Sequence, residues 1–201
     1  MKGIGERIFQ FKITLKGTEP PIWRRIQVPE TFIFWDLHVA IQDAMGWNDS
    51  HLHEFRVKDP SLGLTEVVGI PVEEFEGETK VHPGLEKKIA DYFLAAGATA
   101  DYVYDFGDNW RHTLELEGII PRKEGIRYPL CIDGKRACPP EDCGGIEGFH
   151  DFLEAALVLG HKDHGQTLTW AGGEFNVNKF DPQEVIFDDP QERWKTAFIV
   201  K

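Results

Sequence analysis

Apolar and polar residues alternate along several short segments of the chain, and a period of two is typical of half-buried strands. This pattern predicts strands over residues 8–15, 22–28, 51–57, 100–106 and 110–117. The last two segments enclose the sequence Gly107-Asp108-Asn109, which has the composition of a tight turn. These two segments therefore predict a hairpin. Prolines bracket the second segment, which we expect to pair with the first.

Apolar residues at helical spacing predict four helices. The first carries Leu37, Ile41, Ala44 and Met45 and ends at Gly46. The others are predicted over 85–96, 148–159 and, as a short helix, 164–171. Strands and helices do not alternate as regular βαβ units, which favours antiparallel pairing. The predicted fold class is α+β, with antiparallel strands and hairpins packed against about three to four helices.

Three segments lack a clear period. Residues 60–84 and 121–147 are rich in glycine and proline and predict loops, the first with one short strand near residues 67–70. A long irregular loop such as 121–147 is usually functional or mobile in a compact domain. Residues 188–201 are predicted to form a C-terminal tail. The whole chain, 1–201, is predicted to be a single domain.

Charge and composition exclude several classes of function. The chain of 201 residues has 22 Lys and Arg against 34 Asp and Glu, a net charge of −12. Because such a field repels phosphates, general nucleic-acid binding is not expected. No apolar run is long enough to span a bilayer and no signal peptide is visible, so we expect a cytoplasmic protein without membrane contact. With serines only at positions 50 and 61, the sequence also argues against a serine hydrolase.

Histidines and aspartates mark the first candidate site. On a strand, His51 and His53 would share one face, which is a common start of a divalent-metal site. The hairpin sequence places Asp105, Asp108 and His112 around one turn. If the two strands are neighbours, these groups could bind zinc or manganese, or act as acid and base. The alternative is a buried polar network with a structural role.

The segment 131–145 offers two further sets of groups. Cys131, Cys138 and Cys143 are separated by six and four residues, which is not the tight spacing of zinc knuckles. A structural zinc site remains open, but three reduced thiols are the favoured interpretation. Glu141 and Asp142 follow two prolines, which could present these carboxylates to a ligand or let them cap the next helix.

Six sequence blocks, in order, resemble the plasmid pRiA4b ORF-3-like family. They are PIWRRIQVP, LHVAIQDAMGW, HLHEFRV, YDFGDNWRHTLELE, CIDGKRACPPEDCGGIEGF and WAGGEFNVNKFDP. The resemblance runs from about residue 8 to about residue 187, and the YDFGDNWRH and PPEDCGG blocks are its most specific parts. It implies a single α+β domain and an association with mobile elements. It implies no established activity and no catalytic residues.

Two functions are consistent with these patterns. The favoured hypothesis is a cytoplasmic binding or accessory module with another protein as partner. The alternative is a divalent-metal-dependent hydrolase, either a nuclease or a phosphoesterase, in which a carboxylate activates a metal-bound water. Both hypotheses use the same candidate residues: His51, His53, Asp105, Asp108, His112, Glu141 and Asp142.

Overall fold

One curved sheet carries the fold of the computed structural model, which describes residues 7–72 and 80–198. Eight strands follow the order β5-β4-β3-β6-β7-β1-β2-β8, and all neighbours are antiparallel except β4 and β5. The strands are β1 (Arg7–Leu15), β2 (Ile22–Pro29), β3 (His53–Lys58), β4 (Thr65–Gly69), β5 (Val81–Pro83), β6 (Thr99–Tyr104), β7 (Trp110–Pro121) and β8 (Leu130–Lys135). The α+β class and the single domain are confirmed.

Two predicted pairings are present in the sheet. Strands β6 and β7 form the expected hairpin, with Tyr104 opposite Trp110 across the turn. Strands β1 and β2 pair over residues 8–15 and 22–29, with Leu15 opposite Ile22. Strand β3 pairs with β6, so the histidine-bearing segment does lie beside the hairpin.

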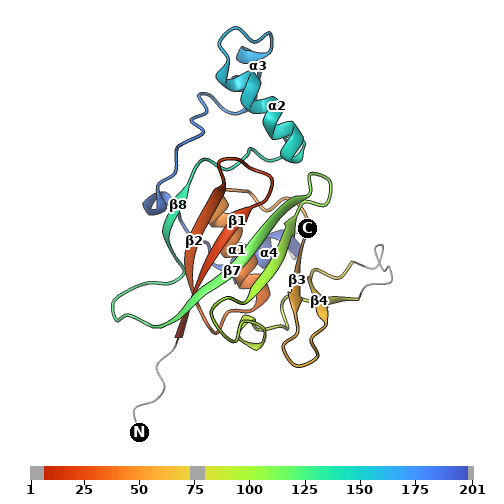
Figure 1. Ribbon diagram of the computed structural model, residues 1–201, viewed down its shortest axis with the longest axis vertical. Coiled ribbons are helices and arrows are strands. Elements are labelled where there is room, and N and C mark those ends of the chain that lie inside the picture. The colour runs from red at the N-terminus through yellow and green to blue at the C-terminus, as the bar shows by residue number, and fades with distance from the viewer. Residues whose placement is uncertain (1–6, 73–79, 199–201) are drawn as a thin grey trace.

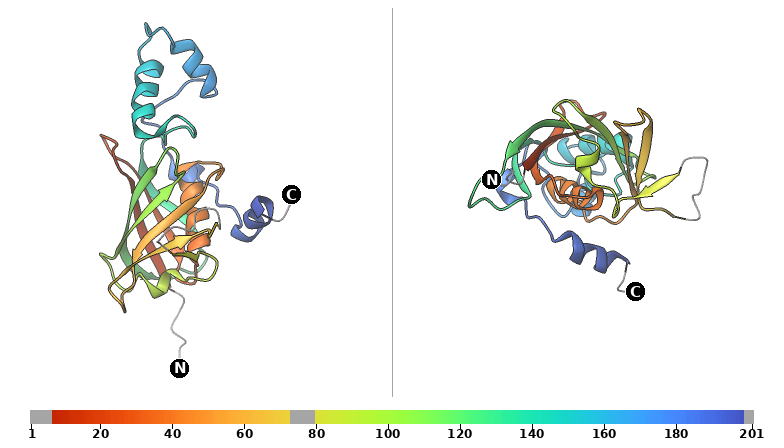
Figure 2. Two further views of the ribbon diagram at one scale, coloured as in Figure 1. Left: turned by 90° about the vertical axis from the view of Figure 1, so that its right-hand side faces the viewer. Right: turned by 90° about the horizontal axis from the view of Figure 1, so that it is seen from below.

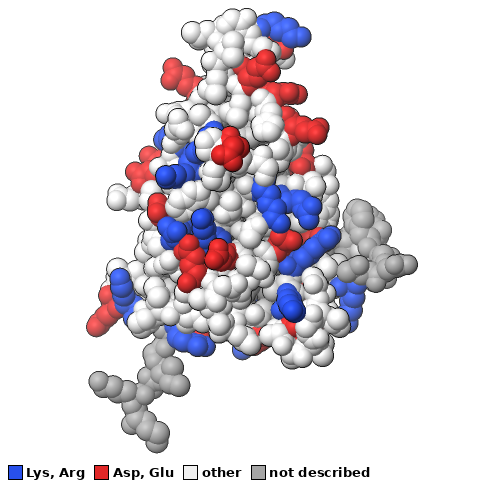
Figure 3. Space-filling view, viewed as in Figure 1, with Lys and Arg blue, Asp and Glu red and all other residues white. Residues whose placement is uncertain are grey.

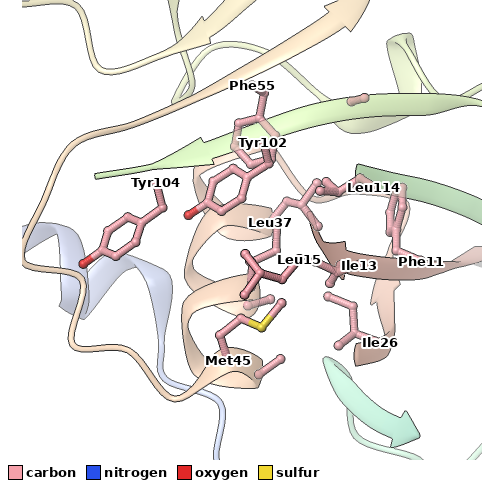
Figure 4. Packing of buried hydrophobic residues seen from close by; sticks show 14 of the residues in the cluster. Phe11, Ile13, Leu15, Ile26, Leu37, Met45, Phe55, Tyr102, Tyr104 and Leu114 are labelled. Carbon is pink, nitrogen blue, oxygen red and sulfur yellow. The ribbon is translucent and has the colours of Figure 1, made fainter. Parts of the chain in front are cut away.

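The sheet curves around α1 (Phe34–Met45), which lies in its hollow (Figures 1 and 2). Helix α1 ends where Gly46, with φ 87°, donates its N–H to the Gln42 carbonyl. Leu37 and Met45 from this helix pack against residues of β6, β1 and β2 (Figure 4). Tyr102 and Tyr104 both point from β6 toward the α1 side (Figure 4).

The remaining helices lie outside the hollow. Helices α2 (Gly145–Leu157) and α3 (His164–Trp170) pack together beyond one end of the sheet, and α4 (Pro190–Phe198) lies on the α1 side (Figures 1 and 2). The C-terminal tail therefore contains a helix. Within the described residues, no helix is both long and apolar enough to cross a membrane.

The prediction of a helix over residues 85–96 was wrong. The chain forms only a short 3-10 turn, η2 (Ile89–Asp91), in this region. Ile89 and Phe93 are buried, but Leu94 is 60% exposed. The apolar spacing therefore reflected a segment packed against the core, with contacts such as Phe11 on Phe93, rather than a regular helix.

The segment predicted as an irregular loop over 121–147 also contains regular structure. Strand β7 extends to Pro121, and β8 adds an edge strand that pairs with β2. The short strand expected near residues 67–70 corresponds to β4. Strand β5 also falls within the region that was predicted as loop over 60–84, and this second strand was not predicted. Residues 73–79 of the same region lie outside the described part.

Charged side chains of both signs are interspersed on the face shown in Figure 3. Arg25 on β2 illustrates this arrangement, because its guanidinium contacts Glu117 at 2.6 Å and Asp133 at 3.0 Å. Arg24, the adjacent residue, points the other way and is 1% exposed. The two adjacent arginines therefore lie on opposite faces of β2 and do not form a basic patch.

Candidate functional site

One imidazole and two carboxylates meet where three segments of the chain converge. The His51 Nε2 atom lies 2.9 Å from Asp142 Oδ1 and 3.7 Å from Asp105 Oδ2. One ligand atom from each of these three residues can be chosen so that all lie within 4.8 Å of one another. Asp105 is buried, while His51 is partly exposed and Asp142 is exposed. The cluster therefore has one side open to solvent.

The hairpin turn fixes the position of Asp105. This residue follows β6 and has φ 54°, in the left-handed region. Its Oδ1 atom accepts a hydrogen bond from the Gly107 N–H, and its own N–H donates to the Leu52 carbonyl. The second bond ties the residue after His51 to the start of the turn. A non-glycine residue with positive φ is uncommon and is often found at functional sites.

A separate set of contacts places Asp142. Glu141, the preceding residue, accepts hydrogen bonds from the Tyr104 hydroxyl at 2.5 Å and from the Asn48 N–H at 2.9 Å. The Trp47 indole donates to the Pro139 carbonyl. These bonds fix the loop before α2 against the segment after α1. Asp142, with φ 58°, then projects from this anchored loop toward His51.

Asp108 holds the hairpin turn against the start of α2. Its Oδ2 atom accepts a hydrogen bond from the Gly144 N–H at 3.1 Å. Gly145 has φ 68°, and a Cβ atom there would collide with the Asp108 carbonyl oxygen. The close approach of the two segments therefore requires glycine. Asp108 has a structural contact and does not belong to the cluster around His51.

The two remaining histidines of the predicted set are core residues. His53 is 3% exposed and stacks on His38, with ring centroids 3.4 Å apart. His112 is fully buried between the rings of Trp47 and Tyr102. Because β3 begins at His53, His51 precedes the strand and the two histidines belong to different clusters. The structure thus brings together three of the seven candidates.

The three thiols do not form a ligand group. Among the described residues, only the cluster around His51 brings three possible metal ligands together. Burial raises the pKa of Cys131 to about 11 and that of Cys138 to about 12. It also raises the pKa of Cys143 to about 12. Because zinc binds the thiolate form, these environments do not favour a cysteine site.

A second polar cluster, beneath α4, was not predicted. His38 contacts the Tyr102 hydroxyl through Nδ1 at 2.9 Å and Asp49 through Nε2 at 2.7 Å. The Gln42 amide also donates to the Tyr102 hydroxyl. Burial lowers the pKa of His38 and raises the pKa of Asp49 to about 6. The sequence signal for this cluster was His38 and Gln42, two polar residues four positions apart on the buried face of α1.

Open space borders the cluster around His51. Asp142 lines a cavity of about 630 Å³ beside α2 and α3. It also lines a second cavity of about 560 Å³, together with Ser50 and Glu141. Imidazole nitrogen and carboxylate oxygen are suitable ligands for zinc, manganese and iron. Three such ligands leave coordination positions free, so the arrangement can hold a cation that also contacts water or another molecule.

The comparisons with known proteins identify relatives over nearly the whole chain. A family model described as plasmid pRiA4b ORF-3-like protein matches residues 7–184. The uncharacterized protein y4hQ of Sinorhizobium fredii is 33% identical over 190 residues, covering 93% of this chain and 94% of the relative. The crystal structure of a protein of unknown function, MM3350 from Methanosarcina mazei Go1, is 42% identical with a TM-score of 0.83, covering 92% of this chain and 100% of that one.

Proposed function

Because the chain belongs to the plasmid pRiA4b ORF-3-like family, and the names of its relatives state no activity, we propose a function from geometry. The protein is a binding module in which His51, Asp105 and Asp142 hold one divalent cation. The observation that carries this proposal is the convergence of three ligand atoms within 4.8 Å. Zinc and manganese both suit one imidazole and two carboxylates.

Two features support a cation over a merely structural network. Asp105 and Asp142, the two carboxylates near His51, both have a positive φ. This left-handed backbone conformation costs free energy in a residue other than glycine. Asp142 is also exposed, and a solvent-exposed ion pair contributes little to stability. A cation would bring the two carboxylates together and neutralise their repulsion.

Elemental analysis of protein purified without affinity nickel tests this function. We expect about one zinc or manganese per chain in the wild type, and chelation should lower the melting temperature. The His51→Gln variant should lose the metal, although glutamine can still donate a hydrogen bond to Asp142. His150→Gln on the exposed face of α2 is the matched control. Equal metal content in both variants would rule out the site.

The anchor of the loop should affect metal binding without touching the metal. Tyr104→Phe removes the hydrogen bond to Glu141 and should cost about 1–3 kcal/mol of unfolding free energy. Because this bond positions the residue before Asp142, metal affinity should fall about tenfold. Tyr92→Phe is a suitable control, because it removes a similar bond, to Glu66, elsewhere in the fold. Calorimetry and thermal melting of both variants measure the two effects; an equal loss of metal affinity in both would refute the positioning role.

A metal-dependent hydrolase is the second candidate. The two cavities beside Asp142 favour it, because a bound cation would face enough space for a small substrate. In that case a metal-bound water would be the nucleophile. Hydrolysis of bis(p-nitrophenyl) phosphate that depends on manganese and disappears in Asp105→Asn would support this function. If the metal-saturated protein does not hydrolyse the substrate, the hydrolase is excluded and the binding module is the function that stands.

A further inference from the structure

Helix α4 is attached to the body of the protein through an arginine and a tryptophan, and the arginine meets several carboxylates. The Arg193 guanidinium lies 2.5 Å from Asp43 Oδ1 and 2.6 Å from Asp188 Oδ2. It also lies 3.9 Å from Asp49 Oδ2. Asp43 and Asp49 belong to the body, and their side chains are only 5% and 7% exposed. Arg193 thus fills a hollow lined with carboxylates.

An aromatic contact accompanies the arginine. The Trp194 ring meets the Trp35 ring edge-on, with centroids 4.9 Å apart. The Trp35 indole N–H also donates to the Pro190 carbonyl at the start of α4. The hollow therefore has a charged wall, Asp43 and Asp49, and an aromatic wall, Trp35. Both walls are built from α1 and the segment that follows it.

The floor of this hollow is organised by residues that precede α4 in the chain. Asp49 is held by the buried His38, which stacks on His53 and contacts the Tyr102 hydroxyl. From α4, Arg193 approaches this network at Asp49, with 3.9 Å between its Nη1 atom and Asp49 Oδ2. Burying carboxylates is costly, and a buried ion pair is poor evidence of a stabilising role. Such a rigid polar surface is better suited to recognising a cation.

The rest of α4 contributes little to its attachment. Apart from Arg193 and Trp194, the residues over 191–197 are exposed. An isolated helix of this length is not stable in water, so α4 depends on those two side chains. A cavity of about 650 Å³ also remains between α4 and the loop after α1. In addition, α4 lies beyond residues 7–184, which the family model matches.

We propose that the hollow formed by Trp35, Asp43 and Asp49 is a recognition site for a helical segment of another protein that carries an arginine next to an aromatic residue. Helix α4 fills this site in cis and is displaced when the partner binds. The complementarity is chemical, because Asp43 accepts a hydrogen bond from the Arg193 guanidinium, Asp49 adds negative charge beside it, and Trp35 offers a ring for an aromatic contact. The empty space beside α4 would accommodate a longer segment.

A labelled peptide with the sequence of residues 188–198, DDPQERWKTAF, is the probe for this site. The receptor is the full chain carrying Arg193→Ala and Trp194→Ala, which frees the hollow. We expect this variant to bind the peptide in fluorescence anisotropy, and the wild type to bind it about tenfold more weakly because α4 competes. Chelator is present throughout, so the result does not depend on the proposed cation site.

Two controls test whether the arginine is what is recognised. A peptide with alanine in place of its arginine should bind about tenfold more weakly or not at all. Adding Asp49→Asn to the freed receptor should weaken binding of the unmodified peptide to a similar degree. Equal binding of both peptides, or no binding by a freed receptor that remains folded by circular dichroism, would overturn the proposal.

Hydrogen exchange on the wild-type chain decides the matter if the freed receptor unfolds. Excess unlabelled peptide should increase amide exchange over residues 190–198, because it displaces α4. Unchanged exchange at millimolar peptide would overturn the proposal. A concentration-dependent dimer of the wild type that Asp49→Asn dissociates would also overturn it, in favour of a second copy as the occupant.

Discussion

Replacing Arg24 with alanine should lower the free energy of unfolding by about 3–5 kcal/mol. This side chain is 1% exposed and donates to the carbonyls of Ala44, Trp23 and Lys135. Its guanidinium also lies 3.7 Å from the centroid of the Phe180 ring. Truncation would leave three carbonyls without this donor, the one of Ala44 in a buried bond and the other two partly buried, and would open a cavity. The arginine therefore joins β2, the end of α1, β8 and the C-terminal segment.

The adjacent arginine provides the matched control. Arg25 points to the opposite face of β2, where its ion pairs with Glu117 and Asp133 are partly exposed. Arg25→Ala should therefore cost only about 0–1 kcal/mol. Arg24→Lys keeps the charge but loses the forked geometry, and an intermediate loss is expected. Urea unfolding measures all three variants, and similar losses for the two alanine variants would contradict the role assigned to Arg24.

Acidification should destabilise the protein through its buried histidines. Burial lowers the pKa of His112 from 6.5 to about 3. Between these pH values the unfolded chain binds a proton that the folded chain does not. The free energy of unfolding should therefore fall as pH falls, by up to about 1.4 kcal/mol per pH unit from this residue. The stabilising contribution of the neutral, buried His112 is fully present above pH 6.5.

A variant isolates this contribution from the other titrating groups. Asp49 opposes the trend, because burial raises its pKa and the folded chain takes up a proton there first. His112→Phe keeps an aromatic ring between Trp47 and Tyr102 but cannot titrate. We expect it to recover about 2 kcal/mol of the loss between pH 7 and pH 5. Urea unfolding at both pH values measures this, with the exposed His150→Gln as control; parallel pH profiles for wild type and His112→Phe would contradict the assignment.

Local periodicity predicted the strands well because each has one face in the core. The β6–β7 hairpin was predictable, since its turn sequence and both alternating strands point to the same structure. Strand β8 was not, because Pro129 precedes it and Gly134 interrupts its pattern. It is an edge strand whose position depends on pairing with β2, and long-range pairing leaves no local signal.

The site was predicted in part, for the same physical reason. His51 and the Asp105 turn were expected to meet only if their two strands were neighbours, and the pairing of β3 with β6 satisfies that condition. Period two assigned His53 to the same face, but the strand begins only at that residue, so His51 is free to turn toward Asp142. The role of Glu141 as an anchor depends on Tyr104, a contact that only the tertiary structure reveals.

Asp105 is the buried ligand of the proposed cation site, and replacing it gives the most direct test. Asp105→Asn keeps an oxygen that can accept the Gly107 N–H but removes the negative charge. Calorimetric titration of manganese and of zinc into chelator-stripped protein should show one saturable site in the wild type. Asp105→Asn should bind about a hundredfold more weakly, and the exposed Asp91→Asn should bind normally. No saturable binding of either ion by the wild type, or equal binding by Asp105→Asn, would contradict a cation at His51, Asp105 and Asp142.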